Sequence, residues 1–115
     1  MECYNHTKEN FCSQEMQELV VLRFGLYLKE GEQVTLARAA QLFRNVNSIH
    51  IEVFTYLRED GWSWKFRIHK LTVLLQEKIL YESTEWYPTY PWALMRALEW
   101  LFENENFELV FRSNF

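Results

Sequence analysis

The chain has 115 residues, of which 49% are hydrophobic and 17% aromatic, and its net charge is −4. That length and apolar share suit one globular domain with a single core. The negative charge argues against strong attraction to nucleic-acid phosphates or to an anionic membrane surface.

The first twelve residues are mostly polar and end at Cys12. They lack the apolar stretch of a signal peptide, and no later run approaches the roughly 20 apolar residues of a membrane-spanning helix. Two cysteines, Cys3 and Cys12, do not make a disulfide framework in a chain of this size. We therefore expect a flexible leader over 1–12, a single domain over 13–115, no membrane segment and a cytoplasmic location.

Two helices are predicted ahead of any strand. Ser13 can cap the first, whose apolar residues recur at helical spacing until Gly31, a residue type that commonly ends helices. Thr35 can open a shorter helix that runs through Arg44, with small and apolar residues on one side. Residues 45–48 are expected to break it.

The most informative pattern is a pair of alternating segments on either side of Asp60-Gly61. Asp-Gly is a preferred two-residue hairpin turn, since both central positions need a positive φ. The sequence therefore predicts a strand over Ile49–Leu57 that pairs with a strand over Trp62–Lys70. On one face, the expected pairs are Leu57 with Trp64, Thr55 with Phe66 and Val53 with Ile68. On the other face, they are Arg58 with Ser63, Tyr56 with Lys65, Phe54 with Arg67 and Glu52 with His69.

The remaining elements complete a predicted α+β fold. A strand from Ile79 to about Trp86 would make the sheet a three-stranded antiparallel meander, after a polar turn at 76–78. Two prolines keep the segment from Trp86 to Trp92 extended, and a helix of about Trp92–Glu103 would then pack on the sheet. Alternation over 107–111 is consistent with a short fourth strand.

The aromatic connector and the last helix form the first candidate binding surface. Trp and Tyr side chains on a proline-stiffened loop can bind a partner with little loss of entropy. The competing interpretation is that these rings seal the edge of the core. The candidate interface residues are Trp86, Tyr87, Tyr90, Trp92 and Trp100.

The outer face of the hairpin is the second candidate surface, with Phe54, Tyr56, Lys65 and Arg67. Aromatic rings beside cations on a sheet can hold single-stranded nucleic acid. Such pairs also stabilise a hairpin without any ligand, and the acidic balance of the chain counts against nucleic acid.

His50, Glu52 and His69 fall on the same side near one end of the hairpin. Two imidazoles and a carboxylate can hold a divalent metal, but a surface His–Glu pair is also a common ion pair. The chain has no Gly-rich phosphate loop, nucleophile elbow or metal motif. We therefore predict no catalytic residue, no metal and no cofactor.

An alternative interpretation makes residues 47–59 a helix. Leu36–Ala40 followed by Asn47–Ile49 and by Leu57–Trp62 is similar to a winged helix-turn-helix, which would make the chain a DNA-binding regulator. The β-branched residues in this stretch favour a strand instead, and a helix here would present acidic side chains to DNA.

We favour the interpretation of a small non-enzymatic module that binds another protein, as adaptors and inhibitors encoded by phages and mobile elements do. Small size, an acidic balance and a surplus of aromatic residues fit it. The expected partner is a protein, either foreign or a second copy of this chain.

Overall fold

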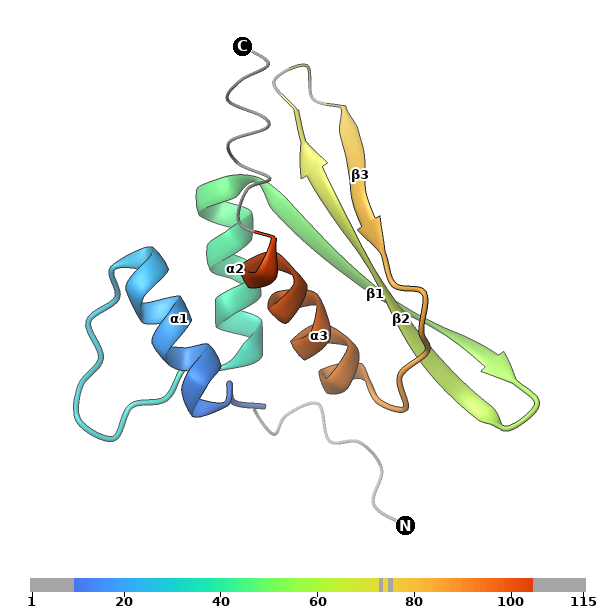
Figure 1. The fold of residues 1–115 in the computed structure, drawn as a ribbon, viewed down its shortest axis with the longest axis horizontal. Coiled ribbons are helices and arrows are strands. Elements are labelled where there is room, and N and C mark those ends of the chain that lie inside the picture. The colour runs from blue at the N-terminus through green and yellow to red at the C-terminus, as the bar shows by residue number, and fades with distance from the viewer. Residues whose placement is uncertain (1–9, 73, 75, 105–115) are drawn as a thin grey trace.

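The computed structural model describes residues 10–72, 74 and 76–104. Within these ranges the chain forms three helices and one antiparallel sheet (Figure 1), which confirms the α+β class. The predicted strand over 107–111 and the first nine residues of the leader lie outside the described residues. The elements are α1 (Gln14–Phe24), α2 (Leu36–Asn47), β1 (Ile49–Arg58), β2 (Gly61–Leu71), β3 (Glu77–Glu82) and α3 (Tyr90–Glu103).

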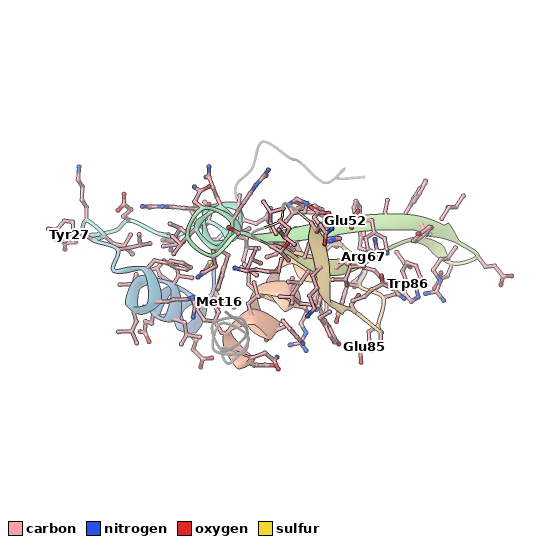
Figure 2. All side chains as sticks on the ribbon, turned by 90° about the horizontal axis from the view of Figure 1, so that it is seen from above. Met16, Tyr27, Glu52, Arg67, Glu85 and Trp86 are labelled. Atoms are coloured by element: carbon pink, nitrogen blue, oxygen red, sulfur yellow. The ribbon has the colours of Figure 1, made fainter. Side chains whose placement is uncertain are left out.

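The sheet has the order β1-β2-β3, so β2 is its central strand. Helix α3 packs on β1 and β2, and α2 packs on β1 and on α3 (Figure 1). Seen from above, α3 lies on one side of the sheet, and none of the described helices lies over the opposite side (Figure 2). We call the covered side the inner face and the other side the outer face. None of the described helices is long and apolar enough to cross a bilayer.

Helix α1 begins as predicted, because the Ser13 hydroxyl accepts a hydrogen bond from the Met16 amide. Its predicted end at Gly31 is wrong. The helix stops at Gly25, whose φ of 63° is left-handed and whose amide donates to the Val21 carbonyl. Glycine reaches this conformation without steric cost, so the first glycine ends the helix.

Helix α2 is capped by Thr35 as predicted, but it continues past Arg44 to Asn47. Ser48 then adopts a left-handed φ of 57°, and its amide donates to the carbonyls of Arg44 and Phe43. This cap passes directly into β1 without an intervening loop. The predicted break over 45–48 is therefore reduced to a single residue.

The hairpin forms, but its register differs from the predicted one by two residues. Only Gly61 has a positive φ (116°) at the turn, so Glu59 and Asp60 make the turn and Arg58 pairs with Gly61. A type I turn followed by a left-handed glycine is the next most common hairpin connection. The shift is even, so every side chain keeps its predicted face while its partner changes. The observed pairs include Leu57 with Trp62, Thr55 with Trp64, Val53 with Phe66, Phe54 with Lys65, Glu52 with Arg67 and His50 with His69.

The strand over Ile49–Arg58 also contradicts the alternative interpretation, which needs a helix over residues 47–59. β-branched residues at alternate positions pack well on a pleated surface, and here that local preference prevails. The recognition helix of a winged helix-turn-helix is therefore not present in this segment.

The last two elements are shifted from their predicted bounds. Strand β2 ends at Leu71, and β3 covers Glu77–Glu82 rather than 79–86, because the turn closes earlier through a bond from the Thr72 amide to the Gln76 carbonyl. Helix α3 begins at Tyr90 with Thr89 as its cap, and Pro91 lies in its first turn as expected.

The core lies between the inner face and the helices. The N-terminal helices cover part of α3 that a three-stranded sheet alone would leave exposed. The most deeply buried side chains are Phe43, Ile49, Ile68, Leu98, Leu101, Val20 and Val34.

Candidate functional site

The outer face is built from the even-numbered residues of β1 and the odd-numbered residues of β2, because side chains alternate along a strand. All four residues predicted for this face, Phe54, Tyr56, Lys65 and Arg67, lie on it. Trp86 joins them from the connector after β3, so the two predicted groups meet at this side chain.

Three side chains of the hairpin surround Trp86. The Tyr56 ring meets it edge-on with centroids 5.5 Å apart. Arg58 Cζ lies 4.8 Å from the Trp86 ring centroid and Lys65 Nζ lies 4.6 Å from it. Both distances are within the range at which a cation is attracted to an aromatic face.

A second ring extends this cluster along β1. Phe54 meets Tyr56 edge-on at 5.7 Å, and Arg67 Cζ lies 5.0 Å from the Phe54 centroid. We call Phe54, Tyr56, Arg58, Lys65, Arg67 and Trp86 the ring–cation cluster.

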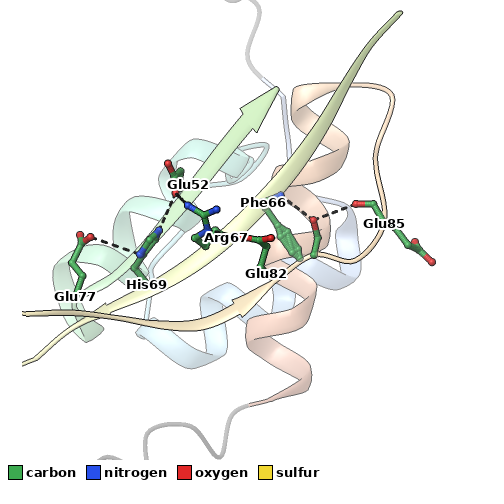
Figure 3. Close-up of polar contacts among 8 residues, drawn as sticks. Glu52, Phe66, Arg67, His69, Glu77, Glu82 and Glu85 are labelled. Atoms are coloured by element: carbon green, nitrogen blue, oxygen red, sulfur yellow. Dashed lines mark hydrogen bonds and ion pairs between the residues drawn. The ribbon is translucent and has the colours of Figure 1, made fainter. Parts of the chain in front are cut away.

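The structure explains how Trp86 reaches the outer face. Buried Ser83 follows β3, where its amide donates to the Phe66 carbonyl (2.9 Å) and its hydroxyl accepts from the Phe66 amide (3.1 Å). The same hydroxyl donates to the Glu85 carbonyl at 3.2 Å (Figure 3). These bonds hold the chain against the edge of β2 and fix the point from which Trp86 extends.

Arg67 links the cluster to two carboxylates. Its Nε lies 2.6 Å from Glu82 Oε1 and its Nη1 lies 3.2 Å from Glu52 Oε1 (Figure 3). The hydrogen bond with Glu82 is the main reason that the pKa of Arg67 is raised above its ordinary value. Its charge is therefore locally balanced, in contrast to the charges on Arg58 and Lys65, which make no ion pair within the described residues.

His69 lies between two carboxylates at the far end of the outer face. Its Nε2 is 3.0 Å from Glu52 Oε1, and its Nδ1 is 3.7 Å from Glu77 Oε2. The expected contact between Glu52 and His69 is present, although Glu52 is opposite Arg67 and it is His50 that is opposite His69. The hydrogen bond from His69, more than the charge of Arg67, lowers the pKa of Glu52, and burial opposes this shift.

The His50 and His69 rings are 5.9 Å apart, yet the surrounding donors do not converge on one point. Among the described residues, no three His, Cys, Asp or Glu side chains are grouped so that they could hold a metal ion.

The connector residues other than Trp86 point in different directions. Tyr87 is buried and stacks on Phe66 (6.1 Å, 10°), while its amide and carbonyl bond to those of Trp64. Tyr90 meets the Trp64 ring edge-on at 5.6 Å. These two rings therefore pack against β2 inside the fold.

The two tryptophans of α3 also differ. Trp100 stacks on Tyr81 of β3 with centroids 4.8 Å apart. Trp92 is 50% exposed at the start of the helix and is not part of the core. The five interface candidates thus do not form one surface.

The tip of the hairpin was not singled out from the sequence. Here the inner face continues beyond the helices, so that Leu57 is 68% exposed and its cross-strand partner Trp62 is 61% exposed. Their apolar character suggested burial, and only the position of α3 shows that nothing among the described residues covers them.

Comparison with known proteins gives no match: no family model fits the sequence, and no curated protein and no solved structure is similar to it.

Proposed function

We propose that the chain is a small non-enzymatic protein-binding module, of the adaptor or inhibitor kind, and that the ring–cation cluster is its binding surface. One observation carries this proposal: three aromatic rings and three cations are gathered on the face of the sheet over which no described helix lies. Aromatic residues and arginine are the types enriched in protein interfaces.

The contribution of the ring–cation cluster to folding stability does not by itself explain why these residue types lie on this face. A partly exposed cation on a ring contributes about 0.5–1 kcal/mol, which polar cross-strand pairs of other kinds also supply. Tyr56 is 55% exposed, so much of its ring area is not used in folding. Rigid rings that are already packed edge to edge lose little entropy when a partner covers them.

The charges indicate the chemistry of the partner. The carboxylates of Glu52 and Glu82 balance the charge of Arg67. Arg58 and Lys65 instead contact the Trp86 ring, and neither makes an ion pair with a carboxylate among the described residues. A partner surface that offers a carboxylate beside an apolar group would pair with one of these cations and cover the ring. An acidic protein surface is therefore favoured over a basic one.

Single-stranded nucleic acid is the other ligand that rings and cations can hold. The net charge of −4 and the carboxylates of Glu52 and Glu82 beside the cluster oppose a phosphate backbone. We therefore propose a protein, and nucleic-acid binding is an outcome that the experiment must distinguish.

A photo-cross-linking amino acid at Tyr56, introduced in the native host, tests the proposal. We expect from this position a discrete adduct with a protein other than this chain, and no adduct from Tyr27, which is 86% exposed and lies at the opposite end of the molecule (Figure 2). The change Lys65→Glu in the same chain should abolish the adduct, whereas Lys29→Glu, on an exposed loop, should leave it unchanged.

Two results would contradict the proposal. Equal cross-linking from Tyr56 and Tyr27 would mean that the cluster is an ordinary surface. A salt-sensitive shift of single-stranded oligonucleotides that disappears in Lys65→Glu would assign the face to nucleic acid instead.

A further inference from the structure

The free edge of the sheet runs along β1 and presents backbone groups that the ring–cation cluster does not use. The bonds on the far side of β2 determine which backbone groups of β1 point to this edge. Trp64 exchanges both backbone bonds with Tyr87 (2.8 and 2.7 Å), and the Phe66 carbonyl accepts from Ser83 (2.9 Å). The backbone groups of Trp64 and Phe66 therefore point away from β1.

In an antiparallel ladder, residues opposite each other either exchange both bonds or exchange none, in alternation. Thr55 is opposite Trp64 and Val53 is opposite Phe66, so both belong to the pairs that exchange none. Their own amides and carbonyls point outward from the sheet. By the same alternation, Ile51 and Leu57 present theirs as well, and no described residue bonds to the backbone of these four positions.

This edge lacks the features that usually prevent strand pairing. Strand β1 is ten residues long, contains no proline and has no bulge in its pairing with β2. The residues whose backbone groups point to the free edge, Ile51, Val53, Thr55 and Leu57, have uncharged side chains. Protected edge strands, in contrast, commonly carry a charged side chain on the face that points into the fold. A long regular edge of this kind is a template for another strand.

We propose that a second copy of this chain pairs with the free edge, β1 against β1 in antiparallel orientation, with Thr55 opposite Thr55 on the two-fold axis. In this register the Thr55 amide of each chain donates to the Thr55 carbonyl of the other, because both of these backbone groups point to the free edge. It also matches side chains on both faces. The pairs are Glu52 with Arg58, Phe54 with Tyr56, and Val53 with Leu57, each formed twice by symmetry.

The same register accounts for a hollow beside the start of β1. A space of about 600 Å3 lies between α2, β1 and the start of α3. With Thr55 on the axis, Glu59 of the second copy is opposite Ile51 and its Asp60 is opposite His50. The acidic turn of one chain then meets the end of the hollow where the other chain has Arg44 and His50. Arg44, His50 and Ile51 are among the residues that line the hollow.

Exposure supports this occupant. Leu57 (68% exposed) would lie beside Val53 of the second copy, and Tyr56 would lie beside Phe54. Antiparallel pairing would thus cover apolar surface at the tip of the hairpin. It would also join the two sheets into one, with a continuous outer face. This inference goes beyond the proposed function, because backbone groups of β1 hold the edge pairing together, although Phe54, Tyr56 and Arg58 of the ring–cation cluster also form side-chain pairs across it.

Light scattering on the full chain and disulfide trapping test the inference together. Wild type should have twice the monomer mass at micromolar concentration. In a background with Cys3 and Cys12 replaced by Ser, Thr55→Cys should form a covalent dimer under mild oxidation. A Cα separation of about 5.5 Å across a bonded pair permits this disulfide.

The matched control is Val53→Cys, which should not cross-link to itself but should cross-link when mixed with Leu57→Cys. Thr55→Pro removes the outward amide and the hydrogen bond from the Thr55 hydroxyl to the Ser63 carbonyl, and it should at least halve the fraction of dimer while circular dichroism stays native. If this variant unfolds, the cysteine results alone decide.

A wild-type monomer at all concentrations up to the millimolar range would overturn the inference. So would cross-linking that is equally efficient at Thr55 and Val53. Lys65→Glu should leave the mass measured by light scattering unchanged. The dimer and the proposed binding surface are therefore tested by different variants, and either proposal can be refuted without the other.

Discussion

Two faces of one hairpin use aromatic residues in different ways. On the inner face, Phe66 is 2% exposed and is held between Tyr81 and Tyr87. On the outer face, Phe54 is partly exposed beneath the Arg67 guanidinium, and Tyr56, which is 55% exposed, meets the Phe54 ring edge-on. Burial fixes the first set, whereas weak polar contacts arrange the second.

Aromatic content alone therefore does not show where a core is. Phe66 removes its whole ring from water, and apolar burial is the largest favourable term in folding. The outer rings gain less from burial and leave area available to a partner.

The largest effect is expected for Phe66→Ala. Removal of a buried phenylalanine leaves a cavity between Tyr81 and Tyr87 and should lower the free energy of unfolding by about 3–5 kcal/mol. The matched change on the outer face, Phe54→Ala, should cost about 1 kcal/mol. Urea denaturation measures both, and equal losses would show that the two faces do not differ in this way.

The second prediction concerns Ser83, which holds the connector against β2. Ser83→Ala leaves the buried Phe66 amide without its acceptor and should cost about 1–3 kcal/mol. The Trp86 fluorescence should also change, because the chain that positions this ring loses its anchor. Ser63→Ala serves as the control, since its hydroxyl has no bond within the described residues, and a loss as large there would refute the explanation.

The third prediction is a smaller loss for Trp86→Ala, of about 1 kcal/mol. Two cation contacts and one edge-on ring contact are removed from a partly exposed position. The double-mutant cycle with Lys65→Ala should give a coupling of about 0.5–1 kcal/mol. A coupling near zero would mean that the close approach of these two side chains carries no energy.

The smallest effect is the pH dependence that Glu52 introduces. Its pKa is lowered in the folded chain, so it contributes stability above its unfolded pKa and loses that contribution as the pH falls through the folded value. Between about pH 5 and pH 3, Glu52→Gln should therefore lose stability less steeply than wild type. Glu30→Gln, which removes an exposed carboxylate outside the network, is the control, and identical curves for wild type and Glu52→Gln would contradict the prediction.

Side-chain parity made much of the fold predictable. Alternation over 49–71 identified both strands and assigned every residue to its face, and Ser13 and Thr35 identified two helix starts. The register was missed because the turn depends on whether Asp60 or Gly61 takes the positive φ, which side-chain alternation does not reveal.

The candidate site was predicted only in part. Phe54, Tyr56, Lys65 and Arg67 share a face by parity alone, but Trp86 joins them through hydrogen bonds between Ser83 and Phe66 that no local pattern indicates. Glu82 meets Arg67 only because β3 starts at 77, in a register set by tertiary pairing. The exposure of Leu57 likewise depends on where α3 ends its cover of the sheet.

We propose that the outer face serves binding rather than folding. The most direct measurement compares, in one variant that carries both Arg58→Glu and Lys65→Glu, the free energy of unfolding and the yield of cross-links from Tyr56. We predict that stability falls by no more than about 1–2 kcal/mol while the protein adduct disappears. A variant that loses as much stability as Phe66→Ala, or that keeps its adduct, would contradict the account.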